Sequence, residues 1–254
     1  MDKRIIKGNF SRCVESYEEH AAVQKRCAEE LISMLRGGSY QDILEVGCGT
    51  GMYTRMLMGE FRGAGITAVD ISEDMVNAAR ENVGDEGLNF EVADGESIGF
   101  KKKFDLITSN ASFQWFEDID TAFDLFRNNL KPGGTLLFSM YGPETFQEFK
   151  AVLGYFFGAR RWLSSSKFLL CREVEALLKK NFSACEVTEA RFCAEYISIW
   201  DFLKNIKKTG TRGEGLGADI FLGKYSLMEL EKKYIENFGG IKATHHVYFC
   251  RAQT

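Results

Sequence analysis

The sequence predicts an α/β fold built on a mostly parallel sheet, and three features indicate it. Short apolar strands alternate with helical segments through the first 140 residues. Glycines at positions 47, 49 and 51 follow the first of these strands, and the second strand ends in Asp70. Because strands joined by helices form parallel units with right-handed crossovers, the ends of these strands should meet at one edge of the sheet.

The segment before the first strand has the pattern of one amphipathic helix, or of a pair of short ones, over residues 10 to 36. Residues of one helical face recur there at alternating steps of four and three: Tyr17, Ala21, Gln24, Ala28, Leu31 and Leu35. Gly37 and Gly38 end the segment.

Five strands are expected before residue 141. We place them at residues 42–46, 66–70, 88–92, 104–110 and 135–140, with helices at 53–61, 73–83 and 119–130. Ser72 is a favourable N-cap for the second helix because its hydroxyl can accept a backbone N–H. The motif Lys131-Pro132-Gly133-Gly134 predicts a turn into the fifth strand.

The rest of the chain supplies two more strands. Residues 141–170 are aromatic and basic without a clear strand, and we interpret them as an inserted cap. Beyond them we expect a helix at 171–180, a strand at 184–197, a segment of helical character at 200–208, a glycine-rich stretch at 210–217, a helix at 226–237 and a last strand at 243–251.

Length and composition fit one soluble α/β domain with insertions. The chain has 254 residues, of which 45% are hydrophobic and 27% charged, and no apolar run approaches the ~20 residues of a membrane span. A net charge of -4 indicates no broad affinity for nucleic acid. No apolar segment of a secretory signal follows the first residues, so we expect a cytoplasmic protein without a membrane partner. The pattern indicates no oligomeric state.

The cysteines indicate neither a disulfide framework nor a metal site. Seven are present, at positions 13, 27, 48, 171, 185, 193 and 250, with no C-x-x-C pair and no histidine at metal-ligand spacing. We expect thiols that mostly pack as small hydrophobic groups.

The glycine spacing indicates which cofactor the first turn suits. A dinucleotide site has the pattern G-x-G-x-x-G, whereas here the glycines follow G-x-G-x-G and position 52 is Met52. Glu45, two residues before the first glycine, would repel a pyrophosphate and attract a cationic amine. S-adenosyl-L-methionine carries such an amine. A nicotinamide cofactor is opposed by both Met52 and Glu45, while a structural turn without a ligand remains the simpler alternative.

Further residues near the same sheet edge suit the parts of this cofactor. The two oxygens of Asp70 can accept both ribose hydroxyls. Asp94 and Gly95 fit the edge of adenine, with a turn aspartate as the alternative, and Ile71 and Met75 fit its faces. The full set of predicted cofactor-binding residues is Tyr17, Glu45, Gly47, Cys48, Gly49, Gly51, Asp70, Ile71, Met75, Asp94, Gly95 and Asn110.

With its elements placed, the chain resembles the class I adenosylmethionine-dependent methyltransferases, whose first motif is similar to residues 45–51. Three further stretches resemble the malonyl-acyl-carrier-protein O-methyltransferases of biotin synthesis, the BioC family. These stretches are Phe10-Ser11-Arg12 with Tyr17 and Gln24, residues 109–115, and residues 203–210 with 244–248. At position 245 this chain has His where the family more often shows Tyr.

The resemblance implies a Rossmann-like fold and a reaction. The fold would be a single domain over residues 1–254, with a seven-stranded sheet whose last strand is antiparallel, an N-terminal helical lid at 1–38 and the inserted cap at 141–170. The reaction would methylate the free carboxylate of malonyl-acyl carrier protein, with S-adenosyl-L-homocysteine as the second product. The methyl ester would then prime pimeloyl synthesis.

This chemistry needs no general base. A carboxylate of pKa near or below ~4 is already an anion at neutral pH, so proximity and desolvation should suffice and we assign no catalytic residue. His245 and His246 lie far along the chain from the cofactor motifs. Gln114, Trp115 and Tyr141 have the aromatic or amide character that suits substrate contact, although Trp115 also suits core packing.

An acidic carrier protein needs positive charge around the mouth of the site. The candidates are Arg160, Arg161, Lys204, Lys207, Lys208 and Arg212, each of which also suits an ordinary solvated face. Two rival functions remain open at this point: methylation of another small-molecule carboxylate, and adenosylmethionine binding without catalysis.

Overall fold

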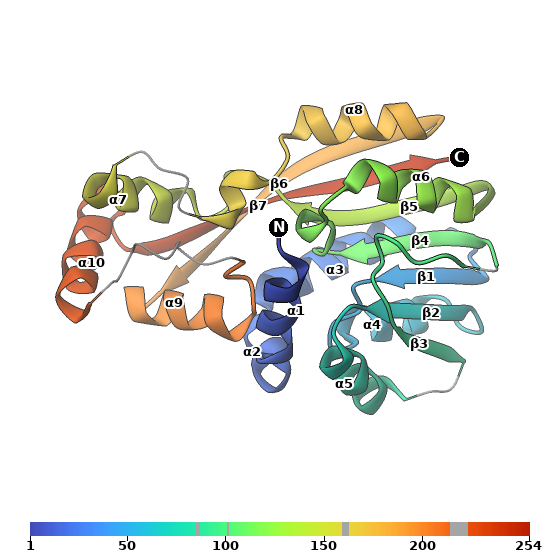
Figure 1. The fold of residues 1–254 in the computed structure, drawn as a ribbon, viewed down its shortest axis with the longest axis horizontal. Coiled ribbons are helices and arrows are strands. Elements are labelled where there is room, and N and C mark those ends of the chain that lie inside the picture. The colour runs from blue at the N-terminus through green and yellow to red at the C-terminus, as the bar shows by residue number, and fades with distance from the viewer. Residues whose placement is uncertain (85–86, 101, 159–162, 214–222) are drawn as a thin grey trace.

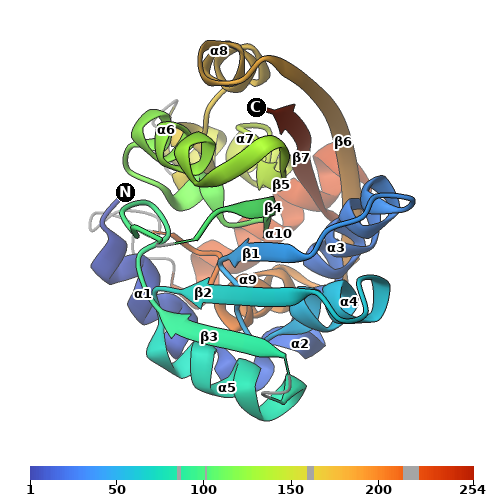
Figure 2. The same cartoon turned by 90° about the vertical axis from the view of Figure 1, so that its right-hand side faces the viewer.

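The computed structural model describes residues 1–84, 87–100, 102–158, 163–213 and 223–254. These residues form a seven-stranded sheet of order β3-β2-β1-β4-β5-β7-β6. The strands are β1 (Asp42–Val46), β2 (Gly65–Asp70), β3 (Leu88–Val92), β4 (Phe104–Asn110), β5 (Leu130–Tyr141), β6 (Ala184–Tyr196) and β7 (Ile241–Gln253). The first five are parallel, and β7 runs antiparallel to both β5 and β6 (Figure 2). The predicted fold class is therefore confirmed.

Helices cover both faces of the sheet. On one face, α3 (Ala22–Leu35), α4 (Met52–Glu60) and α5 (Glu73–Val83) pack on residues such as Ile43 and Ala68. On the other face, α6 (Ile119–Asn129) and α8 (Cys171–Asn181) enclose a core that includes Phe138. Successive residues of β1 therefore pack into the cores on opposite faces of the sheet: Ile43 on one face and Leu44 on the other. This is expected of a strand that is buried on both sides.

Most element bounds agree with the sequence prediction, and β5 is the main exception among the strands. Residues 131–134 were expected to form a turn before a strand at 135–140. The strand instead begins at Leu130, which lies opposite Phe104 on β4, and a register shift follows before Leu106 pairs with Thr135. This irregularity accommodates the Pro132-Gly133-Gly134 stretch within the strand.

The N-terminal segment begins earlier than predicted and contains several short helices. They are α1 (Lys3–Ser11), the 3₁₀ turn η1 (Val14–Ser16) and α2 (Tyr17–His20), followed by α3. The side chain of Asp2 caps α1 by accepting the Arg4 N–H. α1 and α2 lie beside the end of the sheet at which β1 and β2 finish (Figure 1).

A separate group of helices gathers at the far end of the long β6–β7 pair. These are α7 (Gln147–Phe157), α9 (Ile199–Lys208) and α10 (Lys224–Phe238) (Figure 1). Phe149, Phe202 and Tyr234, one from each helix, share a buried cluster. Helix α7, which lies within the predicted cap at 141–170, packs with α9 and α10, and the 3₁₀ turn η3 (Ser164–Lys167) precedes α8.

Candidate active site

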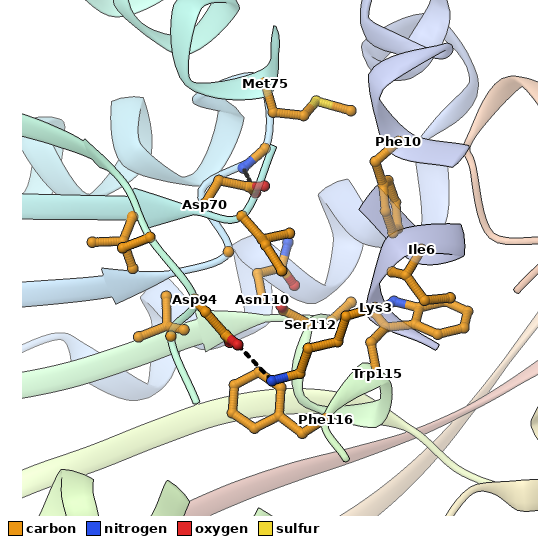
Figure 3. Close-up of a pocket in the computed structure, with 18 of the residues that line it drawn as sticks. Lys3, Ile6, Phe10, Asp70, Met75, Asp94, Asn110, Ser112, Trp115 and Phe116 are labelled. Atoms are coloured by element: carbon orange, nitrogen blue, oxygen red, sulfur yellow. Dashed lines mark hydrogen bonds and ion pairs between the residues drawn. The ribbon is translucent and has the colours of Figure 1, made fainter. Parts of the chain in front are cut away.

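A cavity lies between helix α1 and the carboxyl ends of β1, β2 and β4 (Figure 3). Parallel α/β sheets place ligand sites at this edge, outside the ends of the strands. The residues that line the cavity are Lys3, Ile6, Phe10, Tyr17, Val46, Gly47, Gly49, Val69, Asp70, Ile71, Met75, Ala93, Asp94, Gly95, Asn110, Ala111, Ser112, Trp115 and Phe116.

The glycine turn after β1 brings its backbone to the cavity wall. Gly47 has φ +78°, and a Cβ at this position would lie 2.4 Å from the Ser112 hydroxyl. Gly51 has φ +88° and directly precedes α4, where a Cβ would lie 2.4 Å from a methyl of Val83. Both positions require glycine because of conformation and space.

Asp70 is held by two backbone donors at the end of β2. Its Oδ2 accepts the Gly49 N–H at 3.0 Å and its Oδ1 accepts the Ser72 N–H at 2.9 Å. A carboxylate has about four acceptor sites, so each oxygen keeps capacity for a ligand hydroxyl. Burial raises the pKa of the Asp70 carboxyl, and the two N–H donors oppose that rise. The side chain is therefore oriented in advance toward the cavity (Figure 3).

Glu45 lies behind the glycine turn and not on the cavity wall. Its Oε2 accepts the Thr54 hydroxyl of α4 at 2.6 Å, and the residue is 1% exposed. Burial raises the pKa of Glu45 to about 8, with a smaller contribution from Asp70, so the carboxyl is largely protonated at pH 7.

Lys3 closes one end of the cavity. Its ammonium lies 2.6 Å from Asp94 Oδ2 and 2.5 Å from Glu96 Oε2, both in the segment that follows β3. The backbone N–H groups of Glu117 and Asp118 also donate to Glu96, which fixes that carboxylate. Helix α1 is thus tied by its first residue to the opposite wall (Figure 3).

Aromatic rings form the rest of the roof. Phe10 contacts both Tyr17 and Trp115 edge-on, with ring centroids 6.3 and 6.1 Å apart, and Trp115 meets Phe168 at 5.6 Å. Burial raises the pKa of the Tyr17 phenol, so it stays neutral. On the floor, the Asn110 amide donates to the Gln24 carbonyl and accepts from the Ser139 hydroxyl, which fixes its orientation.

A second cavity begins on the other side of Trp115, which lines both. Its wall is mainly apolar and comes from β5, α7, η3, α9 and β7. The lining residues are Trp115, Tyr141, Thr145, Phe146, Phe149, Leu163, Ser164, Ser165, Phe168, Leu203, Ile206, Lys207, Thr211, Arg212 and His245. No carboxylate stands among these described residues, while Lys207 and Arg212 are exposed cations at its rim.

The structure brings most of the predicted cofactor residues to the first cavity: Tyr17, Gly47, Gly49, Asp70, Ile71, Met75, Asp94, Gly95 and Asn110. Glu45, Cys48 and Gly51 lie behind its wall. Of the predicted substrate residues, Trp115 and Tyr141 line the second cavity. Gln114 lines neither, because its amide donates to the Ala111 carbonyl and accepts the Tyr141 N–H. Arg160 and Arg161 lie outside the described residues.

Sequence reasoning missed several residues of these cavities. Lys3 and Ile6 were missed because the predicted helix began at residue 10, and Phe10, although part of the motif Phe10-Ser11-Arg12, was assigned no contact with the cofactor; the spacing of three and four among these residues is itself a helical signal. Ser112 follows Ala111, a non-glycine residue with φ +53°; it lies in the stretch 109–115 that carries the family resemblance, but it was assigned no role. His245 was set aside because it is distant in sequence, yet β7 returns it to the second cavity.

The described residues contain neither a metal-binding cluster nor a membrane-spanning helix. No three His, Cys, Asp or Glu side chains gather there in a group able to hold a metal ion. Within the same residues, every helix is too short or too polar to cross a membrane.

The glycine turn after β1, the acid at the end of β2 and the antiparallel seventh strand define a class I methyltransferase fold. A family profile described as "Methyltransferase domain" matches residues 44–138. Among solved structures, the YcgJ protein from Bacillus subtilis is similar over 90% of this chain and 98% of its own, with a TM-score of 0.64 and 15% identity. Phosphoethanolamine N-methyltransferase 2 of Haemonchus contortus, solved with S-adenosyl-L-methionine, has a TM-score of 0.54 and 21% identity over 88% of this chain and 52% of its own.

Curated relatives specify the family. Malonyl-[acyl-carrier protein] O-methyltransferase 1 of Ilyobacter polytropus is 34% identical, covering 98% of this chain and 94% of its own. Malonyl-[acyl-carrier protein] O-methyltransferase of Acetivibrio thermocellus is 32% identical, covering 98% and 93%. The chain belongs to the malonyl-[acyl-carrier protein] O-methyltransferase family.

Proposed function

We propose that this protein transfers the methyl group of S-adenosyl-L-methionine to the free carboxylate of malonyl-acyl carrier protein. The products are the malonyl methyl ester and S-adenosyl-L-homocysteine, and the ester would serve as the primer for pimeloyl synthesis in the biotin pathway. The observation that carries this proposal is that two cavities of different chemistry share the Trp115 side chain as a common wall.

The first cavity fits the methyl donor. Each carboxylate oxygen of Asp70 accepts one hydrogen bond from a backbone N–H group. Each can accept a second one, from a ribose hydroxyl. Gly47 lets the turn after β1 pack directly against Ser112, where a Cβ would collide, and both residues line this cavity. Ile71 and Met75 supply apolar surface for the adenine faces. When bound, S-adenosyl-L-methionine supplies an electrophilic methyl group.

The second cavity fits an anionic acyl group that needs little help to react. In the reaction a bond forms between a carboxylate oxygen and the methyl carbon while the bond from that carbon to the sulfonium sulfur breaks. A cation and an anion become a neutral thioether and a neutral ester, so a water-filled or strongly charged site would stabilise the ions and slow the step. The walls around Trp115 are aromatic, with Phe10 on one side and Phe168 on the other. These side chains exclude water and hold the two reactants in line.

The N-terminal helices would form a lid over the donor. Phe10 and Tyr17 roof the first cavity, and Lys3 ties α1 to Asp94 and Glu96. A lid of this kind must open for the cofactor to enter and must close to exclude water. We therefore assign α1, η1 and α2 this role within the region 1–38.

A direct assay tests the proposal. The protein is incubated with methyl-labelled S-adenosyl-L-methionine and malonyl-carrier protein, and label is followed into a base-labile ester. Acetyl-carrier protein is the matched control, because it has the same thioester and lacks the free carboxylate. We expect label only with the malonyl form. If the cofactor binds and no label is transferred, the proposed reaction is rejected.

A further inference from the structure

The second cavity contains polar side-chain atoms that have no partner within the protein. In the part of the chain that the structure describes, five buried side-chain nitrogen and oxygen atoms lack a hydrogen bond. Four of them belong to residues that line this cavity: the Trp115 indole nitrogen, the Tyr141 hydroxyl and both ring nitrogens of His245. Buried polar groups are almost always hydrogen-bonded, so this concentration requires an explanation.

These three side chains differ from the other polar groups of the wall. The Thr145 hydroxyl donates to the His246 carbonyl at 3.1 Å, and the Ser165 hydroxyl donates to the Thr145 carbonyl at 2.9 Å. Those hydroxyls support the local fold. Trp115, Tyr141 and His245 are 7%, 3% and 7% exposed, and their polar atoms form no hydrogen bond with the described residues.

The sheet brings Tyr141 and His245 together. Tyr141 on β5 pairs with Val247 on β7, so His245, two residues from Val247, projects from the same face of the sheet. The two rings lie 5.8 Å apart, and Phe146 packs edge-on against the imidazole at 5.1 Å. His246 points to the opposite face, where its Nε2 pairs with Glu189 Oε2 at 2.7 Å.

The three groups match the acceptors of a malonyl thioester. The indole N–H, the phenol O–H and one imidazole N–H are three donors without formal charge. A malonyl group presents two carboxylate oxygens and one thioester carbonyl oxygen, all acceptors. We infer that Trp115, Tyr141 and His245 form a neutral acyl-binding subsite in which His245 positions the malonyl group as a hydrogen-bond donor and not as a base. This inference rests on the proposed function and names the substrate subsite within it.

The charge distribution supports a neutral donor at position 245. The described ionisable groups that line the cavity besides His245 are Tyr141, Lys207 and Arg212. Burial lowers the pKa of His245 to about 4 and raises the pKa of Tyr141, so both side chains are uncharged at neutral pH. An imidazolium would stabilise the carboxylate in the ground state and slow its methylation, whereas a neutral donor orients it at lower cost.

The test separates a donor from a base and from a packing residue. We compare His245→Gln, which keeps a neutral donor, with His245→Phe, which keeps a ring and has none. Tyr141→Phe removes the second donor. His246→Gln is the matched control, since it changes the neighbouring histidine on the opposite face. For each variant, kcat and KM for malonyl-carrier protein are measured between pH 6 and 9, together with S-adenosyl-L-methionine affinity and thermal stability.

We expect His245→Phe and Tyr141→Phe to lower kcat/KM by about tenfold or more while cofactor affinity stays within about twofold. His245→Gln should retain most activity, and its pH profile should parallel that of the wild type. A wild-type profile with an ascending limb near pH 6 to 7 that is lost in His245→Gln would identify a base instead. Unchanged kcat/KM in both phenylalanine variants would show that the subsite does not exist.

A binding measurement distinguishes this inference from the proposed function. Malonyl-pantetheine is titrated into the protein saturated with S-adenosyl-L-homocysteine. Binding by the wild type that is lost in His245→Phe supports the subsite even where no methyl transfer is detected. Absence of both binding and turnover in the wild type rejects the subsite and the proposed reaction together.

Discussion

The Lys3 ammonium lies 2.6 Å from the Asp94 carboxylate, an ion pair that spans 91 positions of the sequence and ties helix α1 to the wall of the first cavity. Glu96 holds the same ammonium at 2.5 Å. Asp94 is also the residue proposed to contact the edge of adenine. In the proposed arrangement the lid and the cofactor would share one carboxylate, so opening of the lid and exchange of the cofactor should be coupled.

We expect Lys3→Met to release bound S-adenosyl-L-methionine about five- to tenfold faster, because the ion pair is partly exposed and contributes about 1 kcal/mol. The methionine keeps an apolar stem in place of the lysine stem. Stopped-flow displacement measures the rate. Added salt should speed release from the wild type and have little effect on the variant. The control is Arg4→Met, whose side chain is 92% exposed on the same helix. Equal rates in both variants would mean that the lid is held by other contacts.

A second prediction concerns Asp70, whose two oxygens accept the N–H groups of Gly49 and Ser72. Asp70→Ala removes both proposed acceptors of the ribose hydroxyls and loosens the glycine turn, so the cofactor Kd should rise by about a hundredfold or more. Isothermal titration measures Kd. The control is Asp74→Ala, an exposed acid in the first turn of α5. If the two variants bind equally, Asp70 is a structural cap and no ligand contact.

The sequence predicted the parallel half of the fold well, for a local reason. Strands β1, β3 and β4 occupy the residues expected, since β1 and β4 are short and mainly apolar and β3 alternates apolar with polar residues after a glycine turn. Ser72 caps α5 as predicted, accepting the Met75 N–H at 3.3 Å. The signals there involve neighbouring residues and do not depend on distant packing.

The features that the sequence did not reveal depend on long-range contacts. Lys3 has a role only because β3 places Asp94 and Glu96 opposite α1. Gln114 has the chemistry of a ligand contact, but its amide is taken by nearby backbone groups. His245 enters a cavity only because β7 lies beside β5. Residue type alone cannot distinguish a side chain that is free to bind from one that the fold already uses.

The exposed cations near the second cavity should affect the carrier protein and leave the cofactor unaffected. We expect Lys207→Ala to raise the KM for malonyl-carrier protein about three- to tenfold, with a weaker salt dependence than the wild type and an unchanged cofactor Kd. Arg161→Ala carries the same expectation from the sequence. The control is Lys102→Ala, whose ammonium lies near Asp42 at the start of β1, at the opposite edge of the sheet. Steady-state assays at low and high salt measure this KM. Equal changes in KM for the Lys207 and Lys102 variants would contradict a docking role for Lys207.

The buried acid Glu45 makes stability depend on pH in the absence of ligand. Burial raises the pKa of Glu45 from 4.5 to about 8, so across this window the folded chain holds a proton that the unfolded chain has released. Its contribution to the free energy of unfolding is complete below pH 4.5 and is lost as the pH rises through 8. His245 acts in the opposite sense, because its pKa falls from 6.5 to about 4 and stability is lost there as the pH falls. Above pH 6.5, His245 no longer changes the pH dependence of stability, so the effect of Glu45 on the free energy of unfolding can be observed without it.

We therefore expect the free energy of unfolding of the ligand-free protein to fall between pH 6.5 and 8. Glu45→Gln keeps a neutral side chain that can still accept the Thr54 hydroxyl, and it removes this proton from the balance. As the pH rises across this window, the free energy of unfolding of the wild type should fall relative to that of the variant. The relative loss should be on the order of a few kcal/mol. Asp70, whose pKa is also raised, stays in both proteins and cancels in the comparison. Urea unfolding at intervals of pH measures both curves. Parallel curves would show that Glu45 is ionised in the folded protein at neutral pH.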